Sequence, residues 1–126
     1  MPETSFENAQ YLNIATFRKT GARVETPVWF AADNGVFYIF SNRDAGKVKR
    51  LRNSSRCAIA PCTMIGKPTG PWQDSEAFII ADIAEIKAAH AALKKKYGWQ
   101  MTMLDTGARL GRRINQRTFI RIQQPK

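Results

Sequence analysis

The segment SNRDAGKVKRLRNSSR, residues 41–56, concentrates positive charge in a short stretch. Six of its sixteen side chains are Lys or Arg, and Asp44 is its only acidic residue. Ser41 and Asn42 offer hydroxyl, amide and backbone N–H donors at the end of a predicted strand, and Lys47 follows in the first turn of a predicted helix. A helix start carries a partial positive charge, so these groups together could bind a phosphate. The alternative is a solvated helix face, which is what most charged runs are.

Two aromatic stretches could hold a flat ring or a partner chain. Pro27 in TPVWF lacks the N–H that a strand interior needs, so it predicts an edge strand or a distortion. A flat ring could lie against such a strand beside Trp29, and a Trp buried in the core is the equal alternative. The Pro- and Gly-rich loop GKPTGPW, residues 66–72, ends in Trp72, which could be a lid or an interface anchor. The same loop could equally pack on the barrel without a further role.

Side chains for nucleophilic catalysis or metal binding are sparse. His90 is the only histidine and lies in a predicted helix without Ser, Cys or Asp at obvious reach, so we expect a surface or interface histidine. Cys57 and Cys62 have an odd spacing that puts them on opposite faces of a strand, which predicts two reduced packing residues. Asp82 and Glu85, in a strand-like run, would also face opposite sides. With no CxxC pair and no glycine-rich phosphate loop, we expect neither a metal site nor a nucleotide loop.

The chain as a whole is strongly basic. Its 126 residues carry a formal net charge of +10, which predicts an anionic partner: nucleic acid, an anionic membrane or a phosphorylated small molecule. The length predicts a single domain over residues 1–126, with one core. No apolar run approaches the roughly 20 residues that cross a membrane, and MPETSFENAQ lacks the pattern of a signal peptide. We therefore expect a cytoplasmic protein.

The elements that would position these residues are mostly strands. Period-two alternation from Val24 to Phe30 and an Asn-Gly turn at 34–35 predict an antiparallel meander. Val48 and Leu51, three residues apart, predict the apolar face of a helix with basic residues around the rest. Six strands, mostly antiparallel, are enough to close a barrel with that helix at its side or mouth. The predicted strands are residues 11–19, 22–32, 36–41, 56–62, 74–86 and 116–123, and the predicted helices are residues 5–10, 44–52, 87–97 and 103–111.

Several of these pieces, in their order and spacing, resemble one known family. They are TPVWF, then GKVKRLRN with an Arg before the next strand, then APC followed by GKPTGPW. Over residues 6–122 the chain resembles the pyridoxamine 5′-phosphate oxidase-like, FMN-binding split-barrel family. It is most similar to the small branch described as deazaflavin (coenzyme F-420)-dependent oxidoreductases. The resemblance implies a six-stranded split β-barrel that works as a homodimer, with FMN or the deazaflavin coenzyme in two clefts between the subunits.

The resemblance also implies which residues hold the cofactor. The basic segment would hold the phosphate end, and the second strand would lie along the tricyclic ring. The partner's later strands and C-terminal region would complete each cleft, where Trp72, Tyr97 and Trp99 are candidates. The implied phosphate-binding residues are Ser41, Lys47, Lys49 and Arg50, and the implied ring-facing residues are Thr26, Pro27, Val28 and Trp29.

The implied function is hydride transfer between the cofactor and a planar small-molecule substrate, with no catalytic dyad required because the cofactor carries the chemistry. The polyglutamyl tail of the deazaflavin coenzyme suits Lys94–Lys96 and Arg109, Arg112 and Arg113, which favours that coenzyme over FMN. A protein of this fold that only binds FMN, deazaflavin or a heme-type tetrapyrrole is the alternative. A nucleic-acid binder ranks last, because no aromatic stacking platform alternates with the charges.

Overall fold

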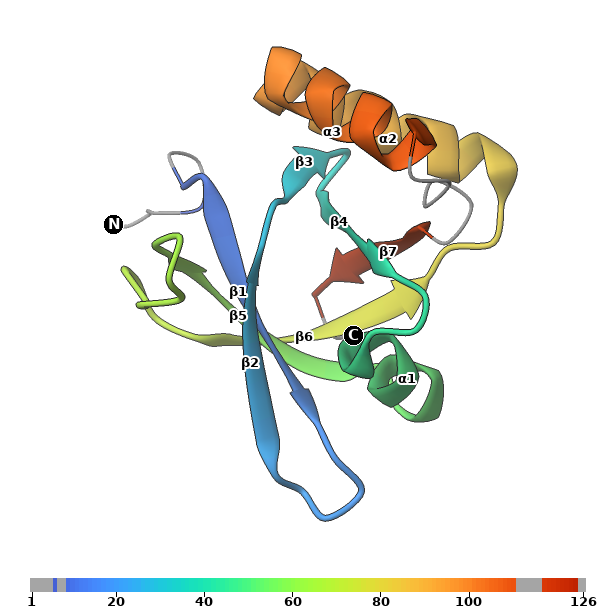
Figure 1. Cartoon of the computed structure of the whole chain (residues 1–126). Helices are drawn as coiled ribbons and strands as arrows, with labels where there is room; N and C mark the ends of the chain where they lie inside the picture. The colour runs from blue at the N-terminus through green and yellow to red at the C-terminus, as the bar shows by residue number, and fades with distance from the viewer. Residues whose placement is uncertain (1–5, 7–8, 111–116, 125–126) are drawn as a thin grey trace.

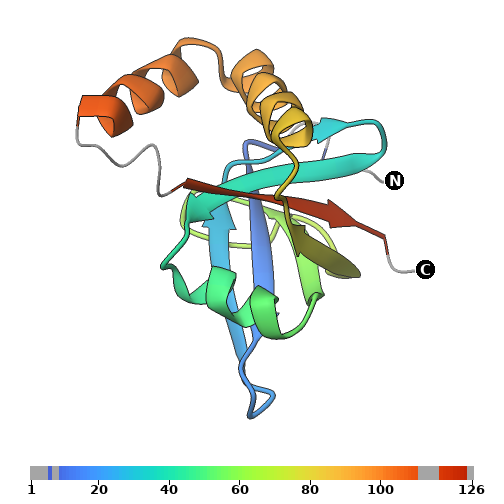
Figure 2. The same ribbon diagram turned by 90° about the vertical axis from the view of Figure 1, so that its right-hand side faces the viewer.

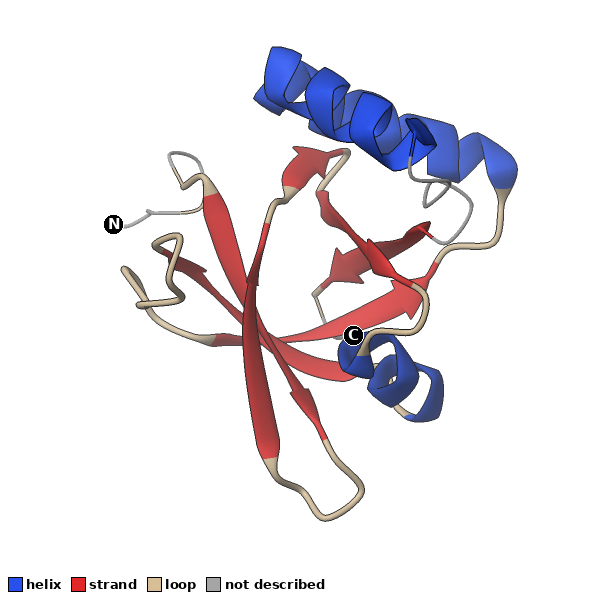
Figure 3. Cartoon of the chain, in the orientation of Figure 1, coloured by secondary structure: helices blue, strands red, loops and turns tan. Residues whose placement is uncertain are grey.

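The described part of the chain forms one antiparallel sheet of seven strands that curls into a split barrel, with three helices around it (Figures 1 and 3). The computed structural model describes residues 6, 9–110 and 117–124. The predicted architecture, mainly β with mostly antiparallel strands and small peripheral helices, is confirmed. The elements are β1 (Tyr11–Phe17), β2 (Arg23–Val28), β3 (Ala31–Asp33), β4 (Val36–Asn42), α1 (Gly46–Asn53), β5 (Arg56–Cys62), β6 (Gln73–Ile79), α2 (Ile83–Tyr97), α3 (Trp99–Leu110) and β7 (Arg117–Gln123).

The sheet curls into a barrel because the stretch predicted as one strand, residues 22–32, provides the strands at both edges of the sheet. The strand order is β2-β1-β5-β6-β7-β4-β3, so β2 and β3 lie at opposite edges although they are consecutive in the chain. β2 pairs with β1 up to Val28, and β3 pairs with β4 from Ala31. The strand predicted over residues 22–32 therefore divides at residues 29–30. That division gives seven strands where six were predicted.

The predicted boundary between the fifth strand and the helix that follows it is wrong. The strand predicted over residues 74–86 ends at Ile79, and α2 begins before the predicted start at Lys87. The carboxylate of Asp82 accepts a hydrogen bond of 2.9 Å from the backbone N–H of Glu85 and caps the helix. Asp82 and Glu85 thus share a helix start and do not lie on opposite faces of a strand. The apolar residues before Asp82 fit the spacing of a strand and also that of a helix, and the cap at Asp82 selects the helix.

The turn predicted at residues 34–35 and the helix end predicted at Gly98 are both present. Asn34 and Gly35 have φ values of 51° and 83°, which is the left-handed backbone of a tight hairpin turn. Gly98, with φ of 58°, ends α2. The helix predicted over residues 103–111 is part of the longer α3. Of the short helix predicted over residues 5–10, residues 5, 7 and 8 lie outside the described residues, and the other three are not helical.

The apolar residues form two clusters, one inside the barrel and one between the sheet and α2 and α3. Strands β4 and β7 contribute to both, because alternate side chains of a strand face opposite sides. Cys57 lies in the barrel cluster, and both cysteines are buried free thiols, as predicted. The barrel cluster includes Leu12, Ile14, Phe30, Ile39, Val48, Leu51, Ile59, Ile120 and Ile122, and the second includes Ala31, Tyr38, Ala89, Leu93, Tyr97, Met101 and Phe119.

The helices occupy two different ends of the barrel. α2 packs on β3 and β4 and carries α3 beside it, and α1 packs on β1 and β6 away from that pair (Figures 1 and 2). In Figure 1, α1 lies near the β1–β2 hairpin, at the foot of the view. None of the helices in the described part of the chain has the length and apolar character needed to cross a membrane.

Candidate functional site

Helix α1 turns a cationic face toward the β1–β2 hairpin. Val48 and Leu51 point into the barrel core, as predicted, which fixes the helix against the sheet. The opposite residues and the hairpin enclose a solvent-open hollow of about 570 Å³. We call it the basic hollow, and its lining residues are Phe17, Arg18, Lys19, Gly21, Gly46, Lys49, Arg50, Asn53, Ser54 and Arg56.

Two of the guanidinium groups in the basic hollow are held in place. Arg50 Nε donates a hydrogen bond of 2.6 Å to Oγ1 of Thr16, a residue that is buried in β1. Gly46 leaves room for that guanidinium, because a Cβ atom there would lie 2.8 Å from Arg50 Nη1. The guanidinium of Arg56 lies 4.0 Å from the ring centroid of Phe17. The hollow is therefore lined by positioned cations.

The lining of the basic hollow contains five cations and no carboxylate. Within the described part of the chain, no ion pair neutralises these cations, since the described pairs involve other bases. Burial and then the charge of Arg18 lower the pKa of Arg50 from its ordinary value. Burial and then the charge of Arg50 likewise lower the pKa of Lys47. A bound anion would relieve this mutual repulsion.

The four predicted phosphate-binding residues do not all lie in the basic hollow. Lys49 and Arg50 line it, whereas Lys47 and Ser41 do not. Lys47 is half-buried in the first turn of α1, and Ser41 lies near the end of β4, opposite Thr118 of β7. No side chain caps α1, and its first turn has no acidic residue. The helix start and Lys47 therefore form a second cationic position, which adjoins the hollow through Gly46, and the role of Ser41 as a phosphate ligand stays a prediction.

Sequence reasoning missed the hairpin half of the basic hollow. Arg18 and Lys19 stand just before the Thr20-Gly21 turn, where cations are usually solvated. Their contribution depends on a contact between the hairpin and α1, which are far apart in the sequence. Local patterns carry no signal for such a contact.

The predicted ring-facing stretch of β2 is an edge strand, as Pro27 indicated. β2 pairs with β1, and no other described strand lies along its free edge. The side chain of Val28 packs on the barrel core. Gly66 of the loop lies against Pro27, and its carbonyl accepts a hydrogen bond of 2.8 Å from Asn13 Nδ2. The side chains of Pro27 and Val28 therefore already pack against their own chain. A ring along the free edge would contact the backbone from Thr26 to Val28.

Trp29 stacks on Tyr97 within the same chain. The two ring centroids are 4.3 Å apart, with an interplanar angle of 8°. The Tyr97 hydroxyl accepts a hydrogen bond of 3.0 Å from the Phe30 N–H and donates one of 2.7 Å to the Gln10 carbonyl. Burial lowers the pKa of the neighbouring Lys96 to about 8, and its Nζ lies 3.4 Å from the Phe30 ring centroid. One face of Trp29 is thus covered, and Tyr97 is a structural residue of its own chain.

Trp72 lies outside the basic hollow. The Arg23 guanidinium sits 4.1 Å from its ring centroid and also pairs with Glu25 at 2.8 Å, at the start of β2. The loop before Trp72 packs on the barrel through Gly66. Trp99 is 70% exposed, and its predicted contact with a partner chain stays a prediction.

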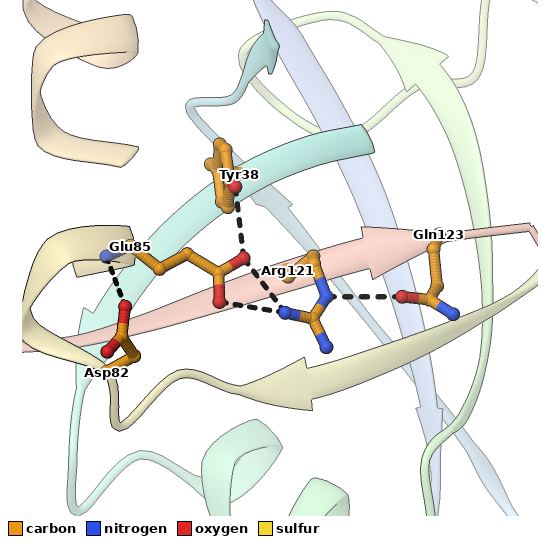
Figure 4. Close-up of polar contacts among 5 residues, drawn as sticks. All are labelled: Tyr38, Asp82, Glu85, Arg121 and Gln123. Carbon is orange, nitrogen blue, oxygen red and sulfur yellow. Dashed lines mark hydrogen bonds and ion pairs between the residues drawn. The ribbon is translucent and has the colours of Figure 1, made fainter. Parts of the chain in front are cut away.

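A polar network fastens the start of α2 to the sheet (Figure 4). Both carboxylate oxygens of Glu85 accept hydrogen bonds of 2.8 Å from Arg121 Nη1, and one of them accepts another of 3.0 Å from the Tyr38 hydroxyl. Arg121 Nε also donates to the side-chain oxygen of Gln123 at 3.1 Å. Burial and the hydrogen bond to Glu85 raise the pKa of Tyr38. All of these groups are satisfied by one another, which indicates a structural role.

His90 has an acidic neighbour that the sequence did not predict. Its Nε2 lies 2.8 Å from Oδ2 of Asp105, and Arg117 Nη1 donates to the other oxygen at 2.6 Å. Burial alone would raise the pKa of Asp105, but the hydrogen bonds from Arg117 and His90 outweigh it and lower that pKa. The expectation that no Asp is within reach of His90 is therefore wrong. The pair joins α2, α3 and β7, and no Ser or Cys is bonded to it among the described residues.

Comparison with known proteins confirms the fold. No family model and no curated protein matches the chain. The solved structure of HutZ, the heme storage protein of Vibrio cholerae, is similar with a TM-score of 0.72 and 12% identity, covering 95% of this chain and 84% of that one. A protein from Listeria innocua assigned as a pyridoxamine 5′-phosphate oxidase has a TM-score of 0.66 and 13% identity over 95% and 87% of the two chains. An F420 reductase has a TM-score of 0.61 and 14% identity over 100% and 97%.

These similar structures share the split barrel but belong to proteins described with different functions. The fold implied by the sequence resemblance is thus confirmed, and flavin-type, deazaflavin and heme proteins all occur on it. Identities of 12–14% do not carry a function from one chain to another. The function must be argued from the residues themselves.

Proposed function

We propose that this protein is a cofactor-dependent oxidoreductase that binds the deazaflavin coenzyme F-420 or FMN. One observation carries the proposal: the uncapped, cationic start of α1, with Lys47, follows directly on the end of β4 in a split barrel. Solved structures of the same fold that are described as an F420 reductase and an FAD-binding protein support it. The reaction would be hydride transfer between the cofactor and a planar small molecule.

The residues present fit a phosphate at the start of α1. In the first turn of α1, the backbone N–H groups of Gly46 and Lys47 remain for a phosphate, because those before and after them already bond to backbone carbonyls. No acidic side chain lies in this turn. Lys47 adds a charge that is partly withdrawn from water, which is why burial lowers its pKa. Ser41 can add a hydroxyl donor. Lys49 and Arg50, which turn toward the basic hollow, would act on the phosphate from the far side of the helix.

The residues also fit a flat ring along β2, mainly through the backbone. The free edge of β2 offers backbone groups to a ring, and Pro27, which lacks an N–H, marks the strand as an edge. Trp29, held by Tyr97, gives this edge a rigid aromatic border. Trp72 would then act from the partner subunit.

The chain itself would bind, orient and shield the cofactor. When bound, the flavin or deazaflavin supplies hydride transfer at its central ring. The protein needs no nucleophile or proton relay for that step, which agrees with a His90 engaged by Asp105. The substrate would be a planar, conjugated small molecule stacked on the ring.

Heme binding without turnover is the second candidate, suggested by the heme storage protein of the same fold. His90 is the only histidine in the sequence, and its Nε2 lies 2.8 Å from Asp105. That contact occupies Nε2 and leaves Nδ1 as the one ring nitrogen for an axial bond, so we rank heme below the flavin cofactors.

The proposed role of Lys47 as a ligand of the cofactor phosphate predicts a large effect of Lys47→Ala on cofactor binding. Loss of one charge-assisted phosphate contact should weaken cofactor binding by at least about tenfold, measured by cofactor fluorescence. Lys87→Ala, which removes the same charge from an exposed position of α2, is the matched control. If both variants bind the cofactor as the unmodified protein does, Lys47 is not a phosphate ligand.

A further inference from the structure

The basic hollow gathers cations from three separate parts of the chain. Arg18 and Lys19 come from the β1–β2 hairpin, Lys49 and Arg50 from α1, and Arg56 from the start of β5. A helix with a solvated basic face would not bring the hairpin's charges to the same place. Like charges gathered without a counter-ion destabilise a fold unless something binds between them.

The hollow is built in a way that a solvated face is not. Thr16, buried in β1, accepts the hydrogen bond that positions Arg50, and Gly46 leaves the space that its guanidinium occupies. The Arg56 guanidinium rests on the Phe17 ring. Positioned guanidinium groups match the oxygens of phosphates and carboxylates, which they can bind in pairs.

We propose that the basic hollow is an anion site in its own right, which binds a small molecule bearing at least two oxyanion groups, such as an oligophosphate. Its volume of about 570 Å³ suits a small molecule. Two or more anionic groups are required because a single exposed ion pair contributes little to binding. The site lies beside the Lys47 position but does not include Lys47 or Ser41 in its lining.

The test is a calorimetric titration of the full chain with pyrophosphate, at about 0.15 M salt, where charges beyond roughly 8 Å are screened. We expect saturable one-to-one binding. Arg18→Ser should weaken it about tenfold, and Lys87→Ser, which removes a charge from α2, should leave it unchanged. Gly46→Ala keeps every charge and shifts only the flexible end of the Arg50 side chain, so its effect should be smaller than that of Arg18→Ser.

Two results would overturn the proposal: no saturable binding of pyrophosphate, or an equal loss in Arg18→Ser and Lys87→Ser. Binding of an oligonucleotide that depends on Arg18, without binding of pyrophosphate, would also overturn it in favour of nucleic acid. The titration needs no flavin cofactor, so its outcome does not depend on the proposed function.

A second titration, with saturating deazaflavin coenzyme present, identifies the source of the anion. Competition with pyrophosphate would mean that the hollow binds the coenzyme's own anionic tail. Unchanged pyrophosphate binding would mean that the hollow takes a separate free oligophosphate. Each result supports an anion site and distinguishes its natural ligand.

Discussion

At the scale of single residues, the Asp105 carboxylate predicts a specific pH dependence of stability. Its pKa is lowered from 3.8 in the folded protein, so the unfolded chain binds its proton more tightly. The stabilisation that this carboxylate contributes is therefore complete above pH of about 4 and is lost as pH falls through the lower, folded pKa. In urea denaturation, the difference in unfolding free energy between the unmodified protein and Asp105→Asn should shrink below that pH. A difference that stays constant on acidification would contradict the assigned role of Arg117 and His90.

For single residues, the sequence predicted the chemical type better than the contact partners. Positive charge around Lys47 and an edge position for Pro27 could be predicted, because each depends on local sequence. The Trp29–Tyr97 stack and the His90–Asp105 pair could not, because each joins residues brought together only by the fold. The type of Tyr97 suits a cofactor cleft, whereas its hydroxyl bonds to the backbone of its own chain.

At the scale of elements, the spacing of apolar residues predicted the buried face of a helix better than the residue at which a helix begins. Val48 and Leu51 correctly predicted how α1 faces the core. The start of α2 was misplaced because its apolar residues also fit a strand, although Asp82 followed three residues later by Glu85 is a helix-start signal. The direction in which the cations of α1 point could not be predicted, since it depends on the hairpin packed beside it.

The cap at Asp82 makes a direct prediction for α2. Asp82→Ala should lower the free energy of unfolding by about 1 kcal/mol, because the Glu85 N–H loses its side-chain acceptor. Asp82→Asn keeps an acceptor and should be nearly neutral. Urea denaturation followed by circular dichroism measures both. Equal loss in the two variants would mean that charge, and not the cap, stabilises the helix start.

At the scale of the whole molecule, the mainly β split barrel with peripheral helices was predictable, because alternation, turn residues and the family resemblance agreed. The division of one strand between two sheet edges was not, since β2 and β3 lie in one uninterrupted strand-like stretch of the sequence. Large apolar side chains remain exposed in the single chain, among them Met64, Ile65, Ile83, Trp99 and Met103.

Those exposed side chains support the proposed homodimer, in which each subunit would complete the other's cofactor cleft. Sedimentation equilibrium should give a mass twice the 14.2 kDa of one chain. A monomer at all concentrations would contradict the dimer and with it the role proposed for Trp72.

The central claim is that this barrel binds a flavin-type cofactor. Its most direct test is a fluorescence titration of the purified protein with FMN and with deazaflavin coenzyme F-420, side by side, at physiological salt. We predict tight binding of the deazaflavin coenzyme, in keeping with the excess of basic residues, and weaker binding of FMN. Tight binding of FMN alone would keep the flavin site but contradict the preference for deazaflavin. Binding of neither would contradict the claim itself, and the split barrel would then have to serve another ligand.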